Sequence, residues 1–311
     1  MPGDSSAVCT LFEGHYHFGL AAFINSLHAQ GYRGNVWAGY RGPLPPWARQ
    51  AVERDGVYTF EAAAGLTIHF IPVETERHLT NFKPDFLIGA RQRFFPDAER
   101  IFYFDPDLVL KCAWPFFENW ASCGVALCED VNSPMPSTHP LRAMWSRFYA
   151  PSGFTVARNL EVYLNGGCVG VSRADWEFVE IWKQLLDVME AGTSTLSVLG
   201  VGDRRQIFHK PDQDALNIAA MFCARPVSVV GKDGMDFMPG GFLISHALGT
   251  PKPWQKNFLR EAVRGFPPTP ADRQFFNYTR EPLRVFSPVT NCLKRLNLSV
   301  ACGVARFYSR R

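Results

Sequence analysis

The sequence predicts an α/β protein in which helices flank a mostly parallel sheet. Two observations predict this class. Short apolar runs with strand character alternate along the chain with segments of helical periodicity. The run at residues 101–104 is apolar at every position, as expected of a strand buried on both faces of a sheet. With 311 residues the chain is long enough to bury a full core.

The first half of the chain opens with a strand, a turn and a helix. We expect the strand over residues 7–11, the turn at 13–16, and a helix whose apolar Leu20, Phe23, Ile24 and Leu27 share one face. The elements expected next are a strand at 35–40, a proline-initiated helix at 45–54, a strand at 67–71, a helix at 84–95 and the strand at 101–104.

The second half continues the alternation. We expect strands over residues 124–129, 163–171, 227–230 and 242–246, and helices over 139–148, over 173–190 and from residue 212. The helix at 173–190 has the clearest apolar stripe and is assigned to the core. Asp212 is a plausible N-cap of the helix that follows it.

Composition narrows the class of protein. A formal charge of +3 is too small to indicate nucleic-acid binding. The eight cysteines include no C-x-x-C pair and lie mostly in apolar runs, which favours reduced core thiols over a zinc site or disulfides. Residues 1–7 lack the basic and apolar regions of a signal peptide, and no apolar run reaches a membrane span of about 20 residues. We therefore expect a cytoplasmic protein.

A proline-rich segment at 266–270 marks a boundary between a main domain, 1–265, and a basic, aromatic extension, 266–311. The extension could pack on the main domain or lie on an anionic membrane surface at the inner face of the membrane. Packing is the preferred interpretation, because the apolar residues of residues 271–311 show no sustained helical stripe.

The strand at 101–104 is followed by Asp105-Pro106-Asp107. Ligands of open α/β sheets bind at the carboxyl ends of the strands, and clustered carboxylates are costly to desolvate without a cation. In extended backbone both carboxylates would point to the same side. A divalent metal site is one interpretation, and a solvated surface turn is the other.

A second polar segment follows the strand at 242–246. His246 ends that strand, Gly249 permits a tight turn, and Lys252 can return toward the same edge. A histidine at a strand end is more often structural than a ligand. Combined with the two aspartates, however, it forms a reasonable shell for manganese, and Lys252 could meet a phosphate.

These segments resemble family 8 retaining glycosyltransferases, which have the Rossmann-like GT-A fold. Asp105-Pro106-Asp107 resembles their D-x-D motif, and residues 246–254 match H-x-x-G-x-x-K-P-W. Leu164-Asn165-Gly166-Gly167 and Asp212-Gln213-Asp214-Ala215-Leu216-Asn217 match two further motifs in the right order. The resemblance covers residues 7–265.

The resemblance implies a UDP-hexose donor, Mn²⁺ or Mg²⁺, and transfer to an acceptor hydroxyl with retention of anomeric configuration. The acceptor, whether saccharide, lipid-linked or protein, is not specified. The implied metal ligands are Asp105, Asp107 and His246; the implied diphosphate contacts are Lys252 and Gly249; the implied sugar-side residues are Lys83, Asn165, Gly167, Asp212 and Gln213, with Asp212 and Gln213 as catalytic candidates; and the implied uracil site is Thr10, Leu11 and Tyr16.

Two alternatives stay open at this point. A sugar-phosphate nucleotidyltransferase would bind a nucleotide sugar on a related sheet, but it would carry a glycine-rich basic loop where this chain has Glu13-Gly14-His15-Tyr16. A non-catalytic carbohydrate-binding protein of the same fold has no need to retain costly clustered carboxylates. The metal-dependent glycosyltransferase is therefore the preferred hypothesis.

Overall fold

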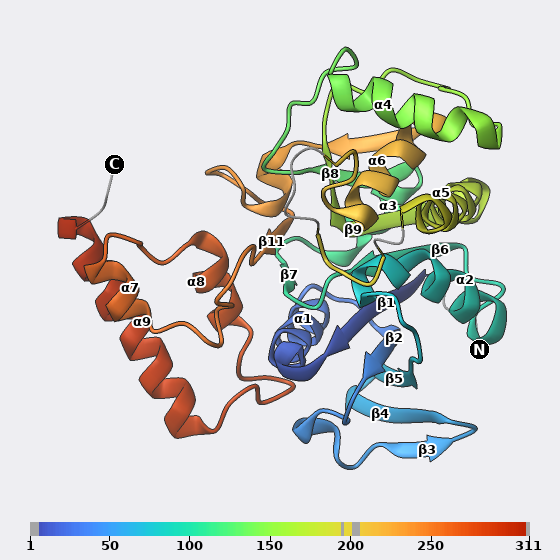
Figure 1. The fold of residues 1–311 in the computed structure, drawn as a ribbon. Coiled ribbons are helices and arrows are strands. Elements are labelled where there is room, and N and C mark those ends of the chain that lie inside the picture. Colours follow the sequence, from blue (N-terminus) through green and yellow to red (C-terminus); the bar gives the residue numbers. More distant parts are fainter. Residues whose placement is uncertain (1–5, 194–195, 201–205, 309–311) are drawn as a thin grey trace.

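The computed structural model describes residues 6–193, 196–200 and 206–308. The strands are β1 (Ser6–Glu13), β2 (Gly34–Arg41), β3 (Val52–Arg54), β4 (Val57–Ala63), β5 (Leu66–Pro72), β6 (Arg100–Phe104), β7 (Leu108–Leu110), β8 (Val125–Glu129), β9 (Leu164–Ser172), β10 (Val227–Val230) and β11 (Ile244–His246). Nine of these strands form one sheet in the order β10-β8-β9-β6-β1-β2-β5-β4-β3 (Figure 1).

Most strands of this sheet run in the same direction. β1 is parallel to β2 and β6, β2 is parallel to β5, and β8 is parallel to β10. β9 is antiparallel to both β6 and β8, and β4 is antiparallel to both β3 and β5. The mostly parallel α/β sheet predicted from the alternating pattern is therefore confirmed.

Helices cover both faces of the sheet (Figure 1). The α-helices of the described chain are α1 (His17–Ala29), α2 (Lys83–Phe94), α3 (Trp114–Ala121), α4 (Pro140–Tyr149), α5 (Glu177–Thr193), α6 (Pro211–Phe222), α7 (Phe258–Val263), α8 (Pro270–Asn277) and α9 (Pro288–Tyr308). α1 and α3 contribute to one core cluster, and α2, α4, α5 and α6 to the other. The helix α3 was not expected from the sequence.

The strand β6 is buried on both faces, as its composition predicts. Phe102 and Phe104 belong to one core cluster, where Phe104 lies 5.4 Å from the ring of Phe23 in α1. Ile101 and Tyr103 belong to the other cluster. Because β6 stands in the middle of the sheet, the Asp-Pro-Asp segment leaves the centre of the molecule at its carboxyl end.

The cysteines do not form disulfides. All eight are free thiols, and Cys9, Cys128, Cys168 and Cys223 are buried. The expectation of core thiols is confirmed for these four. Cys123 and Cys292 are exposed instead.

The strand expected at 242–246 is shorter and lies outside the main sheet. β11 pairs antiparallel with β7 in a separate two-stranded sheet, with His246 opposite Leu108. β7 resumes directly after the Asp-Pro-Asp segment, so this small sheet joins the acidic segment to the histidine. His246 ends its strand, as expected, but that strand pairs with β7 and does not belong to the main sheet.

The prediction of a helix at 45–54 was wrong. The structure has a short 3₁₀ turn at Pro46–Ala48 and then the edge strand β3. β3 turns into β4 through Asp55 and Gly56, whose φ angles are 52° and 76°. Two consecutive positive φ values define a tight hairpin turn, for which Asp-Gly is a favoured pair. The proline at the start of the segment outweighed this signal in the sequence-based prediction.

The carboxy-terminal segment packs on the main domain, but it does so through helices. Leu298, Ala301 and Ala305 of α9 belong to the same buried cluster as α1. The long α9 contradicts the expectation that residues 271–311 lack a sustained helical stripe. The helices of the described ranges include none that is both long and apolar enough to cross a membrane. The division of the chain at residue 265 stays a prediction.

One close approach depends on a glycine. A Cβ atom on Gly19, in the first turns of α1, would meet the carbonyl oxygen of Pro106 and lie 2.7 Å from the ring of Trp254. α1 can therefore pack against the Asp-Pro-Asp segment only with glycine at this position.

We predict that Gly19→Ala destabilises the protein by about 1–3 kcal/mol, because the added methyl overpacks a contact with backbone. The control is Gly89→Ala on the exposed side of α2, where a Cβ meets nothing within 4 Å. That change should stabilise the helix by about 1 kcal/mol. Urea unfolding measures both, and a Gly19→Ala protein as stable as wild type would contradict the prediction.

Candidate active site

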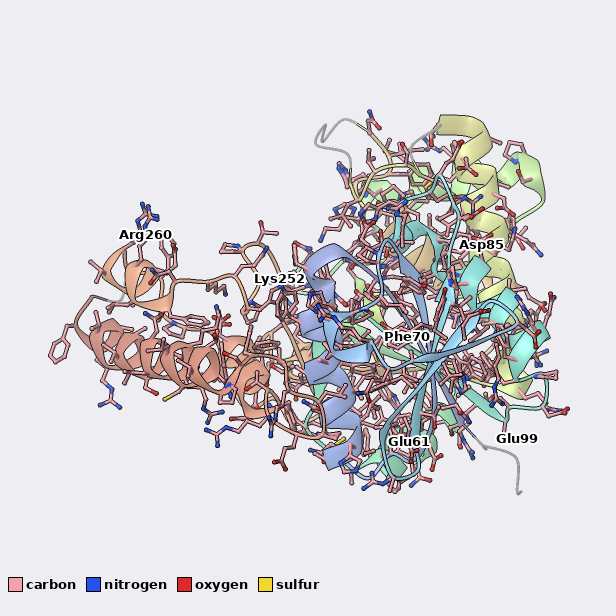
Figure 2. The ribbon with its side chains drawn as sticks, turned by 90° about the horizontal axis from the view of Figure 1, so that it is seen from below. Glu61, Phe70, Asp85, Glu99, Lys252 and Arg260 are labelled. Atoms are coloured by element: carbon pink, nitrogen blue, oxygen red, sulfur yellow. The ribbon has the colours of Figure 1, made fainter. Side chains whose placement is uncertain are left out.

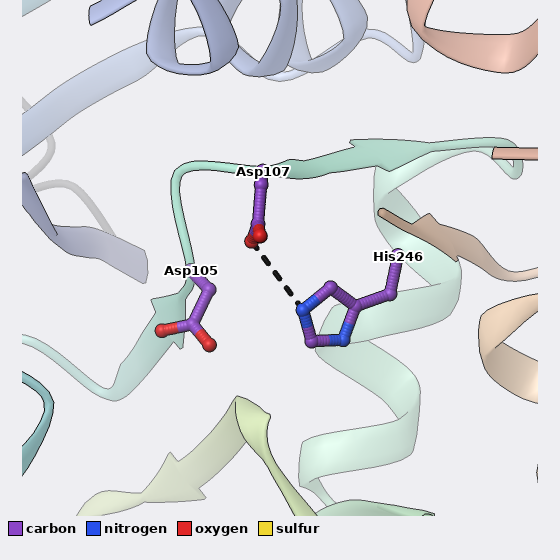
Figure 3. Close-up of side chains that lie close together, drawn as sticks. All are labelled: Asp105, Asp107 and His246. Atoms are coloured by element: carbon purple, nitrogen blue, oxygen red, sulfur yellow. Dashed lines mark ion pairs between the residues drawn. The ribbon is translucent and has the colours of Figure 1, made fainter. Parts of the chain in front are cut away.

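Three potential metal ligands converge at the end of β6. One ligand atom from each of Asp105, Asp107 and His246 lies within 4.8 Å of the other two (Figure 3). The backbone between the aspartates forms a turn, in which the amide of Leu108 donates to the carbonyl of Asp105 at 3.2 Å. The sequence analysis placed the two carboxylates on an extended segment. In the structure they meet across a turn instead. The predicted convergence is confirmed.

His246 reaches the aspartates through the pairing of β7 with β11. Its Nε2 lies 3.3 Å from Oδ1 of Asp107, the contact drawn in Figure 3. Its Nδ1 is buried and has no hydrogen-bond partner among the described residues. The ring packs 5.9 Å from that of Phe237. His246 is thus held in place by its strand and an aromatic neighbour.

Lys252 returns to the same point, as predicted from Gly249. Gly249 has a φ of 72°, a left-handed conformation that favours glycine. The Nζ of Lys252 donates to Oδ2 of Asp107 at 2.5 Å and to the carbonyl of Ala247 at 2.6 Å. Burial opposes ionisation of Asp107, but His246 and Lys252 outweigh it and hold the pKa of this carboxyl well below its usual range.

Lys83 forms a second buried charge cluster on the opposite side of Asp105. Its side chain is 1% exposed, and its Nζ lies 3.0 Å from Asp212 and 3.1 Å from Asp105. It also donates to the carbonyl of Gly166 at 2.8 Å. Burial lowers the pKa of Lys83, but Asp105 and Asp212 outweigh it and raise the pKa to about 12.

β9 and α6 supply the next wall of the site. Asn165 accepts from the amide of Gly167 at 2.9 Å and donates to Asp130 at 2.7 Å. Gln213 accepts weakly from the amide of Gly166 at 3.3 Å, while its Nε2 is buried with no partner in the described chain. A buried donor without a partner is costly, which makes Gln213 available for a ligand.

The expectation that Asp212 caps α6 was wrong. α6 begins at Pro211, so Asp212 lies inside its first turn, and the carboxylate of Asp212 pairs with Lys83. Asp214 makes the hydrogen bonds at the start of α6 instead. It accepts from the amide of His209 at 2.7 Å, from that of Lys210 at 3.0 Å and from the hydroxyl of Tyr163 at 2.6 Å.

A cavity of about 600 Å³ opens beside these groups. Most of the predicted site residues line it, namely Leu11, Tyr16, Lys83, Asp105, Asp107, Asn165, Gly167, Asp212, Gln213, His246 and Lys252. Thr10 and Gly249, although described, are not among its lining residues. Gly249 acts through the turn that places Lys252, and Thr10 is buried in β1.

Side-chain contacts hold the first β-α turn at the rim of the cavity. Glu13 lines the cavity and pairs with Arg41 at 2.8 Å. His15 stacks on Tyr16 at 4.9 Å and accepts from the indole of Trp254 at 3.0 Å. The turn is therefore fixed to the loop that carries Lys252.

Several site residues were missed by the sequence analysis. The hydroxyl of Tyr103 donates to Asp105 at 3.0 Å, and Asp130 orients Asn165. His78 and Lys210 line the cavity. None of the four lies in a recognisable motif, and only Tyr103 had a usable signal, since it lies two residues before Asp105 and so on the same side of the strand.

The three converging residues fit a divalent cation by the chemistry of their donor atoms. Two carboxylates and one imidazole suit Mn²⁺. Gly167 lies beneath them, and a Cβ atom there would lie 2.7 Å from Cε1 of His246 and 3.0 Å from Oδ2 of Asp105. The absence of a side chain at this position leaves the space between these ligands clear.

Solved structures share this fold, although no known family model matches the chain and no curated protein matches it in sequence. An active-site mutant of LgtC has 15% identity and a TM-score of 0.55, with 91% of this chain and 98% of that chain covered. Galactosyltransferase LgtC, in complex with donor and acceptor sugar analogs, has 14% identity and a TM-score of 0.47, with 81% and 90% covered.

The apo structure of the bifunctional glycosyltransferase WbbM has 14% identity and a TM-score of 0.49, with 89% of this chain covered. This chain spans about half of WbbM, 52% of its length. At these identities the likeness concerns the fold. The chain has the α/β fold of LgtC, as expected for the GT-A type.

The buried position of Lys83 generates a prediction. Lys83→Met should destabilise the protein by about 3–5 kcal/mol, because it leaves the buried carboxylate of Asp212 and the partly buried carboxylate of Asp105 without their cation. Lys210→Met, at an exposed position lining the same cavity, is the control and should stay within about 0.5 kcal/mol of wild type. Urea unfolding at neutral pH measures both changes, and equal effects of the two substitutions would contradict the prediction.

The contribution of Lys83 also has a defined pH window. Its pKa is about 12 in the folded protein and 10.5 ordinarily. The stabilisation is therefore fully present below pH 10.5 and is lost as the pH rises through 12.

Proposed function

We propose that this chain is a metal-dependent glycosyltransferase of the family 8 type, which moves a hexose from a UDP-sugar to an acceptor hydroxyl with retention of configuration. The observation that carries the proposal is the convergence of Asp105, Asp107 and His246 beside a cavity at the carboxyl end of the central strand. That edge is where open α/β sheets bind ligands. The fold shared with LgtC supports the same assignment.

Asp105, Asp107 and His246 would hold Mn²⁺ or Mg²⁺. When bound, the ion would supply positive charge against the diphosphate of the donor. Asp107 is already ionised by its neighbours, so no proton has to leave it before it can act as a ligand. The hydroxyl of Tyr103 and the amide of Gly167 orient Asp105 and Asn165 on the other side of the site.

Lys252 would bind the departing diphosphate. Negative charge develops there as the anomeric C–O bond breaks, and a fixed ammonium stabilises it more in the transition state than in the ground state. Lys252 is held by Asp107 and by the carbonyl of Ala247, so little reorganisation is needed for it to act. Tyr16 lies under its Nζ, 5.7 Å from the ring centre.

Gln213 and Asp212 would face the donor sugar, together with Asn165 and Lys83. The buried Nε2 of Gln213 is a donor with no partner in the described chain. Asp212 would stabilise the positive charge that develops on the sugar. Its pairing with Lys83 makes it a poor covalent nucleophile, and this supports attack by the acceptor hydroxyl on the same face as the leaving group.

The base of the donor would lie between Leu11 and Tyr16, near the ion pair of Glu13 with Arg41. Uridine is the proposed base. Thr10 does not line the cavity, so we do not propose it as a contact of the base.

One prediction of the proposed function concerns the metal and the donor. Wild type should release UDP from a UDP-hexose only with Mn²⁺ or Mg²⁺, and UDP with Mn²⁺ should stabilise it by about 2.7 kcal/mol at a hundredfold excess over Kd. Asp107→Asn and His246→Ala should lose both effects. Asp97→Asn, whose side chain is 97% exposed, is the control.

A screen of nucleotide sugars by UDP release, with thermal shift in parallel, measures both effects, and the anomeric configuration of the product is read by NMR. Full activity in either ligand variant would refute the metal site. A thermal shift with another nucleotide and none with UDP would refute the donor assignment.

Another prediction of the proposed function concerns Gln213. Gln213→Ala should lower kcat by about 10²–10³-fold, with a smaller effect on KM, because it removes a donor placed where charge is redistributed. Gln274→Ala in α8 is the matched control. Steady-state kinetics with the donor that the nucleotide-sugar screen identifies provide the test. An unchanged kcat would exclude Gln213 from the catalytic residues.

A further inference from the structure

One hydrogen bond joins two separate segments of the cavity wall. The indole Nε1 of Trp254 donates to Nδ1 of His15 at 3.0 Å. His15 directly precedes Tyr16, which lines the cavity at the first β-α turn. Trp254 lies two residues after Lys252, which lines the cavity in the loop that follows β11. The bond therefore connects two wall segments that lie 239 residues apart in the sequence.

The rings of His15, Tyr16 and Trp254 also pack against one another. His15 stacks on Tyr16, with ring centres 4.9 Å apart and an angle of 18° between the planes. Tyr16 meets Trp254 edge-on at 5.7 Å, and His15 lies 6.0 Å from Trp254. Each ring thus contacts the other two, and we call these three rings the ring cluster. The Nζ of Lys252 lies over one of them, 5.7 Å from the centre of Tyr16.

Trp254 is the anchored member of the ring cluster. It is buried, and its ring packs beside Gly19 of α1 and 5.4 Å from Phe275 of α8. Its carbonyl accepts from Nζ of Lys294 in α9 at 2.9 Å. Figure 2 shows Lys252, two residues earlier, between α1 and the carboxy-terminal helices. The position of this loop is therefore set by contacts with three helices.

His15 is the exposed member of the ring cluster. It follows Gly14, which has a φ of 52°, in the 3₁₀ turn Gly14–Tyr16. The indole nitrogen can only donate, so His15 accepts through an unprotonated Nδ1, and its ring has a defined tautomer and orientation. An exposed side chain contributes little to the core. The contacts of His15 therefore fix the turn locally.

We propose that His15 is a positioning residue that couples recognition of the nucleotide base to recognition of the diphosphate. This inference rests on the proposed function, in which Tyr16 contacts the base of the donor and Lys252 its diphosphate. A nucleoside diphosphate contacts both side chains at once, so their separation has to match the ligand. When the separation is set before binding, the ligand does not have to order the two segments, and affinity is gained.

A purely structural role of the bond predicts a different outcome. Losing a structural contact would lower the stability of the fold without distinguishing one ligand from another. Losing a positioning contact weakens a ligand that spans both segments, because that ligand must now order them. A ligand that occupies only the diphosphate end, such as inorganic pyrophosphate, does not require the two segments to be aligned. The comparison of these two ligands therefore separates the two roles.

Calorimetric titration of the full chain with UDP and with pyrophosphate, both in the presence of Mn²⁺, tests the proposal. His15→Leu removes the acceptor and should weaken UDP binding about tenfold, as expected for one lost hydrogen bond. Its effect on pyrophosphate should stay below about twofold, because this ligand does not span the link. His15→Asn offers an oxygen to the indole and should recover most of the UDP affinity. His28→Leu, at the other end of α1, is the matched control and should change neither affinity.

Circular dichroism and thermal unfolding establish that the variants are folded. Unchanged UDP binding by His15→Leu, an equal loss for UDP and pyrophosphate, or no recovery in His15→Asn would each overturn the coupling. Failure of the proposed function is distinguishable, because wild type itself would then not bind UDP with Mn²⁺. That result would overturn the UDP-sugar assignment and the coupling together, whereas tight UDP binding by both wild type and His15→Leu would overturn the coupling alone.

Discussion

The site depends on one buried carboxylate that needs two partners from a distant segment. The side chain of Asp107 is 7% exposed and lies between His246 and Lys252. A charge at this depth is tolerated only when it is paired. Both partners come from a segment more than 130 residues further along the chain, so β11 and its following turn must be in place before the acidic turn is stable. The site is therefore complete only when these distant segments of the chain are packed together.

The charges of the site form two linked clusters. Lys83 neutralises Asp105 and Asp212, while Lys252 neutralises Asp107. A divalent cation added alone would compete with these lysines for the aspartates, and a diphosphate added alone would compete with the aspartates for the lysines. When cation and diphosphate arrive together, the charges balance again. This arrangement explains physically why the two ligands would bind cooperatively.

The sequence predicted the convergence of Asp105, Asp107 and His246 because all three lie in motifs with a fixed order and spacing. It did not predict how they converge, since pairing between β7 and β11 is a long-range contact of two three-residue strands. Such short strands carry almost no periodic signal. The hydrogen bonds of Asp130 with Asn165 and of Asp214 with Tyr163 were missed because partners in different elements leave no local pattern.

The helix α9 shows what local periodicity leaves undecided. Its apolar side chains point in two directions: Leu298, Ala301 and Ala305 pack on the core, whereas Leu293 and Phe307 face solvent. A repeat in the sequence can place apolar residues on one side of a helix, but which side is buried depends on contacts with distant segments of the chain. Those contacts leave no signal in residues 288–308, so only the structure shows which side of α9 packs on the core.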